Sequence, residues 1–300
     1  MDTKQRFSVR PEVILGLIAL LTMTLFGILL YRSVPYMIAQ RTVLAAPTEP
    51  AGHTDNPVSP EELTEEVTED TTEPTIPPEA NPYNKRDFQY NEHNYLLCTR
   101  QPSYAGVDVS AFQGDIDWEK VADSGIRFAI IRLGYRGWGK AGKLVEDEYA
   151  KINLEGAKRA GLQVGAYFFS QALTVEEVDQ EIELMLNILG DFELDMPIVF
   201  DWEIPAPEAR TANMDARTLT ELQKHFAATM EEKGHDPMIY FNWNISRNLL
   251  YLSELEDYPF WLALYQDRMT YPYRVEMWQY TDRGQVPGIQ GNVDINVYMP

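Results

Sequence analysis

Short apolar runs alternate with longer amphipathic stretches from about Ala105 to the end of the chain. The runs GVDVS, RFAIIRLGY, LQVGAYFFS and MPIVFDWE are separated by stretches with helical periodicity, such as TVEEVDQEIELMLNILG. Short β-rich runs bounded by Gly or Pro, with helices between them, indicate βαβ units and a parallel sheet. About seven strands without a Gly-rich phosphate loop favour a closed barrel over a Rossmann sheet.

The last third of this pattern is less regular. The runs FWLALY and VEMWQYT are separated from their neighbours by only short connections, which leave little room for full helices. The sequence therefore predicts an α/β fold over residues 105–300: an irregular, TIM-like (β/α) barrel with helices missing between the last strands.

An uncharged apolar run lies near the start of the chain, from Val13 to Tyr31. About 20 apolar residues span the hydrocarbon core of a bilayer, so we expect one transmembrane helix at 13–31. Three basic side chains within residues 1–12 favour a cytoplasmic N-terminus. A signal peptide cleaved near Leu44–Ala46 is the alternative. We expect an uncleaved anchor, with the rest of the chain extracytoplasmic.

The segment from Pro47 to Pro82 has a different composition. It is rich in Glu, Thr and Pro and contains no Lys or Arg. Such a segment cannot bury enough apolar surface to offset its ordering entropy, so it should be a disordered spacer. We therefore predict an acidic linker over residues 32–104 that joins the anchor to the folded domain.

Charge and cysteine content exclude several classes of function. The formal net charge is -21, from 25 Lys+Arg and 46 Asp+Glu, whereas nucleic-acid binding needs a basic surface. We therefore expect no nucleic-acid partner. The one cysteine, Cys98, cannot form an intramolecular disulfide, and no Cys and His residues have the spacing of metal ligands. We expect neither a metal nor a cofactor.

Catalytic side chains of (β/α) barrels lie at the carboxyl ends of the strands. In this chain those positions are rich in carboxylates and aromatic side chains, and the candidates are Asp108, Arg132, Tyr135, Tyr167, Phe169, Asp201, Glu203, Tyr240, Asn242, Tyr265, Gln279 and Tyr280.

The strongest local signal is the pair Asp201 and Glu203, which directly follows the apolar run Pro197–Phe200. Two residues apart on a strand, the two side chains point to the same side, whereas Trp202 between them should pack toward the helix layer. Two nearby carboxylates in unequal environments can be an acid and a base, as hydrolysis of a glycosidic bond requires. The alternative is structural: an aspartate that caps a helix and a glutamate paired with an arginine.

Several motifs in order along the chain support the catalytic interpretation. They are Gly106–Ser110, Gln113–Trp118, Gly165–Phe169, Phe260–Tyr265, Trp278–Tyr280 and Gly291–Asn296. Together with the D-x-E pair they resemble glycoside hydrolase family 25, the Chalaropsis-type lysozymes, over about Ala105 to Tyr298. The resemblance implies an irregular β/α barrel. It also implies hydrolysis of the β-1,4 bond between N-acetylmuramic acid and N-acetylglucosamine in peptidoglycan.

The resemblance also implies roles for individual residues. Glu203 would be the proton donor, and Asp201 would stabilise the charged intermediate or position the reacting group. Asp108 and Asp294 would line the cleft and orient these two acids. The candidates for substrate binding are Tyr167, Phe169, Tyr240, Tyr265, Trp278, Gln279 and Arg132. Trp278, like Trp261, could instead be a core residue, because both lie inside apolar strands.

The stereochemistry and some alternatives remain open from the sequence. Retention and inversion are not separable, and we favour the substrate's own acetamido group as nucleophile, steadied by Asp201. A non-catalytic peptidoglycan-binding module, another N-acetyl-sugar glycosidase and a membrane-tethered scaffold are the competing functions. With the anchor in the cell membrane, the domain would face the cell wall, and its partners would be glycan strands and the membrane.

Overall fold

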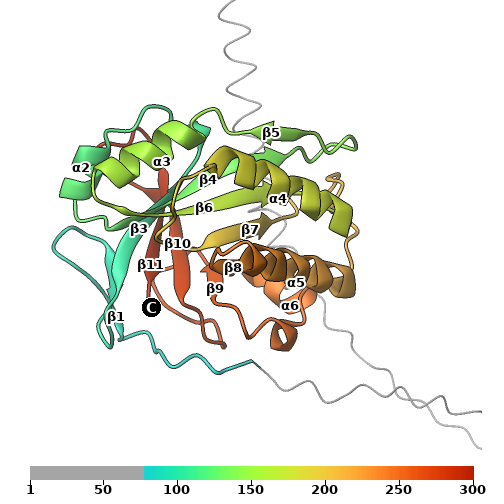
Figure 1. The fold of residues 1–300 in the computed structure, drawn as a ribbon. Coiled ribbons are helices and arrows are strands. Elements are labelled where there is room, and N and C mark those ends of the chain that lie inside the picture. The colour runs from blue at the N-terminus through green and yellow to red at the C-terminus, as the bar shows by residue number, and fades with distance from the viewer. Residues whose placement is uncertain (1–77) are drawn as a thin grey trace, which may run out of the picture. The chain divides into compact units, whose positions relative to one another are not determined.

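The computed structural model describes residues 78–300 (Figure 1). The predicted anchor at 13–31 and most of the predicted linker at 32–104 lie outside these residues. Within the described part of the chain, none of the helices combines the length and the hydropathy that are needed to cross a bilayer.

Eight strands form a closed barrel, which a pairing between β3 and β4 completes. In order around the barrel they are β3 (Tyr104–Val109), β4 (Phe128–Arg136), β6 (Gln163–Ser170), β7 (Ile198–Trp202), β8 (Pro237–Asn242), β9 (Phe260–Ala263), β10 (Met277–Gly284) and β11 (Val293–Tyr298). All neighbours from β3 through β10 are parallel, and β11 is antiparallel to both β10 and β3. A short strand, β5 (Leu144–Glu146), extends β4 outside the barrel.

Helices cover only part of the barrel wall. They are α2 (Trp118–Asp123), α3 (Ala150–Arg159), α4 (Val175–Leu189), α5 (Ala216–Glu232) and α6 (Trp243–Asn248), with a 3-10 turn η2 (Leu252–Glu254) after α6. In the described chain no helix follows β9 or β10. An irregular segment leads from β9 to its parallel neighbour β10, and the antiparallel β11 needs only a short connection after β10. The predicted irregular barrel is thus confirmed, including the missing helices at its end (Figure 1).

The core has two layers separated by the strands. One cluster fills the barrel interior and contains Val199 and Tyr240, and the other lies between the strands and the helices. Trp202 belongs to the outer cluster, where it is fully buried and its Nε1 donates a hydrogen bond to the Ala172 carbonyl oxygen at 2.8 Å. The alternation predicted for the D-x-E strand is confirmed: Trp202 packs toward the helix layer.

A two-stranded hairpin precedes the barrel and covers the wall where helices are missing. Its strands are β1 (Phe88–Tyr90) and β2 (Leu96–Cys98). The Phe88 ring packs edge-on against Trp278 of β10 with 5.1 Å between ring centroids, and the Leu96 N–H donates to the Tyr280 hydroxyl oxygen. Folded structure therefore begins before Ala105, inside the segment 32–104 that the sequence assigns to the linker.

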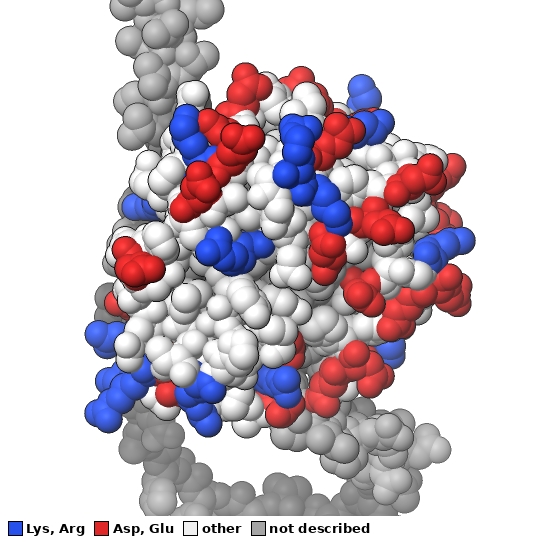
Figure 2. Space-filling view, turned by 60° about the vertical axis from the view of Figure 1, so that its left-hand side comes forward, with Lys and Arg blue, Asp and Glu red and all other residues white. Residues whose placement is uncertain are grey.

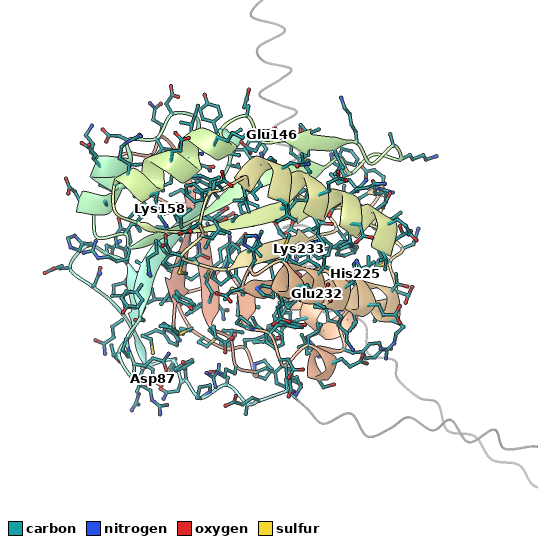
Figure 3. The ribbon with its side chains drawn as sticks, in the orientation of Figure 1. Asp87, Glu146, Lys158, His225, Glu232 and Lys233 are labelled. Carbon is teal, nitrogen blue, oxygen red and sulfur yellow. The ribbon has the colours of Figure 1, made fainter. Side chains whose placement is uncertain are left out.

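Charged side chains occupy the outer layer. On the face shown in Figure 2, acidic and basic side chains are interspersed around an uncharged region. Figure 3 labels several of these residues on the helices, among them Lys158 on α3 and His225 on α5. Lys158 is 2.6 Å from a carboxylate oxygen of Asp195, and the His225 Nε2 is 2.6 Å from Asp179. These charges form local pairs away from the barrel interior.

Candidate active site

Four carboxyl groups meet at the end of the barrel where the parallel strands terminate. Asp108 lies on β3, Asp201 on β7, Glu203 directly after β7 and Asp294 on β11. Because β11 runs antiparallel to β3, Asp294 near its start is the register partner of Asp108 near the end of β3. The structure thus brings together all four acids that the sequence predicts for the site.

Asp108 is held by two amide side chains. Its Oδ2 accepts hydrogen bonds from Gln279 Nε2 at 2.8 Å and from Asn296 Nδ2 at 2.7 Å. The Trp261 Nε1 donates to Asn296 Oδ1 at 2.8 Å and so fixes the orientation of that amide. Asn296 is absent from the sequence-based candidates, although its position two residues after Asp294 on a strand indicates the same face.

Asp108 and Asp294 share a proton. Burial, and then the neighbouring Asp108, raise the pKa of Asp294 to about 9. Burial also raises the pKa of Asp108, while hydrogen bonds from Asn296, Gln279 and Asp294 oppose that shift. With a pKa of about 9, the Asp294 carboxyl keeps its proton at neutral pH beside Asp108, because two neighbouring acids disfavour a second negative charge.

Glu203 and Asp201 form a second pair of neighbouring acids. The Tyr240 hydroxyl donates to Glu203 Oε1 at 3.0 Å. Burial raises the pKa of Glu203, and the Tyr240 hydrogen bond limits the rise. Burial, and then the charges of Glu203 and Asp108, raise the pKa of Asp201 well above its usual value, while Arg132 lowers it. Both shifts favour the protonated form, and a general acid must carry a proton.

The Asp201 carboxylate is buried, and its Oδ1 has no hydrogen-bond partner among residues 78–300. A buried acceptor without a donor costs free energy, so such an atom at the mouth of a barrel fits a donor from a bound molecule.

The backbone of Glu203 is fixed by two side chains that sequence reasoning missed. The Gln171 Nε2 donates to the Glu203 carbonyl oxygen at 2.7 Å, and the Thr211 hydroxyl lies 3.0 Å from the same oxygen. Both side chains are fully buried. Gln171 could have been found as a polar residue directly after an apolar strand, whereas nothing in the local sequence marks Thr211.

The predicted substrate-binding residues divide into two groups. Those that reach the mouth or the barrel interior below it are Arg132, Tyr167, Phe169, Tyr240, Tyr265 and Gln279. The Tyr265 hydroxyl donates to Gln279 Oε1 at 3.1 Å, and the side chain is 55% exposed. Trp278 is not brought there: it is fully buried on the outer face of β10, against Phe88. The sequence left Trp278 either a substrate-binding or a core role, and its position fits the core role.

Comparison with known proteins agrees with this architecture. The model of the family described as glycosyl hydrolases family 25 matches residues 107–289. YegX of Escherichia coli strain K12 is 31% identical in an alignment of 210 positions that covers 64% of this chain and 68% of YegX. The autolytic lysozyme of Clostridium acetobutylicum is 27% identical over 194 residues, which are 64% of this chain and 55% of that protein.

The modular autolysin LytC of Streptococcus pneumoniae, solved with a synthetic peptidoglycan ligand, has the same fold. Its TM-score is 0.58 at 24% identity, over 70% of this chain and 50% of LytC. The chain thus spans about half of the length of LytC and of the autolytic lysozyme. The prediction of an enzyme, a glycoside hydrolase of the lysozyme type, is confirmed by the family match. With its barrel and its four acids at the mouth, this chain belongs to glycosyl hydrolases family 25.

Proposed function

We propose that this chain hydrolyses the β-1,4 bond between N-acetylmuramic acid and N-acetylglucosamine in peptidoglycan. The observation that carries the proposal is the half-buried Glu203 carboxyl at the barrel mouth, with its raised pKa and with Asp201 close enough for the two charges to interact. Relatives named lysozymes, one of them autolytic, support the choice of substrate.

Glu203 is the general acid in this proposal. Burial raises the pKa of this carboxyl and so favours its protonated form, which gives its proton to the leaving glycosidic oxygen as the bond to C1 breaks. The Tyr240 hydroxyl then stabilises the carboxylate that remains. In the second half of the reaction water attacks C1, the bond that the substrate's acetamido oxygen has made to C1 breaks, and the Glu203 carboxylate takes a proton from that water.

Asp201 steadies the reacting acetamido group. Its unpartnered Oδ1 accepts the N–H of the 2-acetamido group, whose carbonyl oxygen forms a bond to C1 as the leaving oxygen departs. A protonated Glu203 does not repel a negative charge on Asp201. The positive charge of Arg132 also lowers the pKa of Asp201 and so favours its ionised form. This route predicts retained configuration, and NMR observation of an inverted first product would exclude it.

We also propose that the barrel lies outside the cell membrane, close to the cell wall. An anchor at residues 13–31 and an acidic linker would hold the barrel outside the membrane, within reach of the cell's own wall. Wall remodelling, or local opening of the wall, fits this arrangement better than attack on distant cells. Recovery of the protein from the medium without its N-terminal segment would contradict it.

The experiment is digestion of purified peptidoglycan by the full chain in detergent, followed by borohydride reduction and mass spectrometry of the fragments. We expect muramitol ends from the wild type and none from Glu203→Gln. Glu183→Gln, on the exposed side of α4, is the charge-matched control and should behave as the wild type. Glucosaminitol ends would mean a different N-acetyl-sugar glycosidase. Wall binding without new ends would mean a binding module.

A further inference from the structure

The Arg132 side chain lies at the barrel mouth between two aromatic rings. Its guanidinium carbon is 5.0 Å from the centroid of the Phe112 ring and 5.3 Å from that of the Tyr135 ring. Its Nε donates to Asp147 Oδ2 at 2.8 Å. The two terminal nitrogens take part in none of the hydrogen bonds among residues 78–300, although the side chain is only 11% exposed. The outer edge of the guanidinium therefore remains available for a ligand.

A bulge in β4 creates this arrangement. Arg132 pairs with Tyr167 of β6 and Tyr135 pairs with Phe169, with a register shift between Arg132 and Gly134. Tyr167 and Phe169 are two residues apart and share a face, so their partners share it too, although Arg132 and Tyr135 are three apart. In a regular strand Tyr135 would point to the helix layer, and the guanidinium would have one aromatic neighbour fewer.

Asp147 holds both the arginine and the turn that carries Phe112. This buried carboxylate accepts hydrogen bonds from Arg132 Nε, from the Ala111 N–H at 3.0 Å and from the Tyr149 N–H at 2.9 Å. Ala111 begins the 3-10 turn η1 (Ala111–Gln113). Phe112 at its centre is 85% exposed, the most exposed large apolar side chain in the described part of the chain. An aromatic ring held in water beside an open guanidinium edge indicates a binding surface.

We propose that Arg132 is a specificity-determining residue that binds a carboxylate carried by the 3-O-lactyl arm of the muramic acid unit. The inference rests on the proposed muramidase function. A guanidinium edge matches a carboxylate with two parallel hydrogen bonds, and the two neighbouring rings favour the cation. N-acetylglucosamine lacks the lactyl arm, so this contact separates peptidoglycan from chitin. The carboxylate is either that of the free lactyl group or one on the attached peptide.

The test compares glycan substrates that contain the same β-1,4 bond. One has peptide-free strands with free lactyl carboxylates, and a second has the same strands with those carboxylates reduced to alcohols. A third has peptide-bearing strands, and a fourth has such strands with the peptide carboxylates amidated. For the full chain, kcat/KM should be about 10-fold or more higher on the substrate with the carboxylate than on its neutral counterpart. This factor corresponds to the free energy of a hydrogen bond to a charged group. If the enzyme prefers the free lactyl carboxylate over its reduced form, Arg132 binds the lactyl group. If it prefers the peptide carboxylates over their amidated form, Arg132 binds the peptide.

Arg132→Gln should bring this ratio close to one, and Arg132→Lys, which keeps the charge without the planar fork, should give an intermediate ratio. Lys151→Gln removes an exposed charge from α3 and should keep the wild-type ratio. If Arg132→Gln lowers kcat/KM for both members of a pair by the same factor, Arg132 acts through Asp201 and the inference is wrong. If the wild type cleaves none of the four substrates, the muramidase proposal fails with it.

Discussion

At the residue scale, the pKa of Glu203 is set by two opposing effects, burial and a hydrogen bond from one hydroxyl group. Burial raises the pKa of this carboxyl, and the Tyr240 hydroxyl, 3.0 Å from Oε1, lowers it by stabilising the charged form. Gln171 and Thr211 hold the carbonyl oxygen of the same residue and so fix the backbone that carries the side chain. Glu203 therefore has hydrogen bonds both at its carboxylate and at its backbone carbonyl oxygen.

Tyr240→Phe should move the alkaline limb of the kcat/KM profile to higher pH, by roughly half a unit to one unit. The reason is that the ionised Glu203 loses its donor while the burial remains. The measurement is release of reducing ends from peptidoglycan as a function of pH. Tyr258→Phe removes a hydroxyl next to the surface residue Glu231 and is the matched control, which should not move the limb. An unshifted limb in Tyr240→Phe would assign the titration to another group.

At the element scale, irregular features position the site. The bulge in β4 turns Tyr135 toward the mouth, and Gly134 permits it, since a Cβ there would lie 2.5 Å from the Val145 carbonyl oxygen. The antiparallel strand β11 brings Asp294 to the carboxyl end of β3. The β1–β2 hairpin covers the wall of β10 and β11, where a regular barrel would have helices.

Phe88→Ala should therefore lower the free energy of unfolding by about 3–5 kcal/mol, because it removes a buried ring and leaves a cavity against Trp278. Gln89→Ala, at the exposed next position, should change stability by only about 0.5 kcal/mol. Denaturant unfolding followed by tryptophan fluorescence measures both. Equal and small effects would mean that the hairpin belongs to the linker and not to the folded domain.

At the scale of the whole molecule, buried acids make stability depend on pH. Burial raises the pKa of Asp108, Asp201, Glu203 and Asp294 at the mouth. It also raises the pKa of Glu181, beside Arg136 in the helix layer, to about 7. Each of these groups binds a proton more tightly in the folded protein than in the unfolded chain, so folding takes up protons.

The free energy of unfolding should consequently decrease as pH rises from about 4, the usual pKa of an aspartic acid, through the raised value of Asp294. Below this window the carboxyl is protonated in both states, and within it only the folded protein keeps the proton. Asp294→Asn should make the decrease shallower, and Asp191→Asn, on the exposed surface after α4, should not. Urea unfolding at a series of pH values measures the slope. A stability that increases over this range would contradict the assigned proton.

Much of the architecture was predictable because its signals are local. The alternation of apolar runs and helical periods predicted the barrel, and the short connections near the end predicted the missing helices. The pleat of one strand predicted that Asp201 and Glu203 share a side and that Trp202 does not. Asp108 came from the strand-end pattern and Asp294 from resemblance to the family, and the structure brings the two together by pairing β11 with β3.

What the local pattern could not provide are contacts between residues far apart in the chain. Trp278 precedes the site residue Gln279, so the pleat puts it on the outer face of β10, and the hairpin packed against that face makes it a core residue. Asn296 lies 188 positions from its partner Asp108, and Thr211 reaches Glu203 across a loop without periodicity. The orientation of Arg132 depends on its hydrogen bond to Asp147 and on a β-bulge that the residue types in β4 do not predict. Period and propensity are properties of neighbouring residues, whereas hydrogen-bond partners are selected by the closure of the barrel, which brings all strands to one mouth.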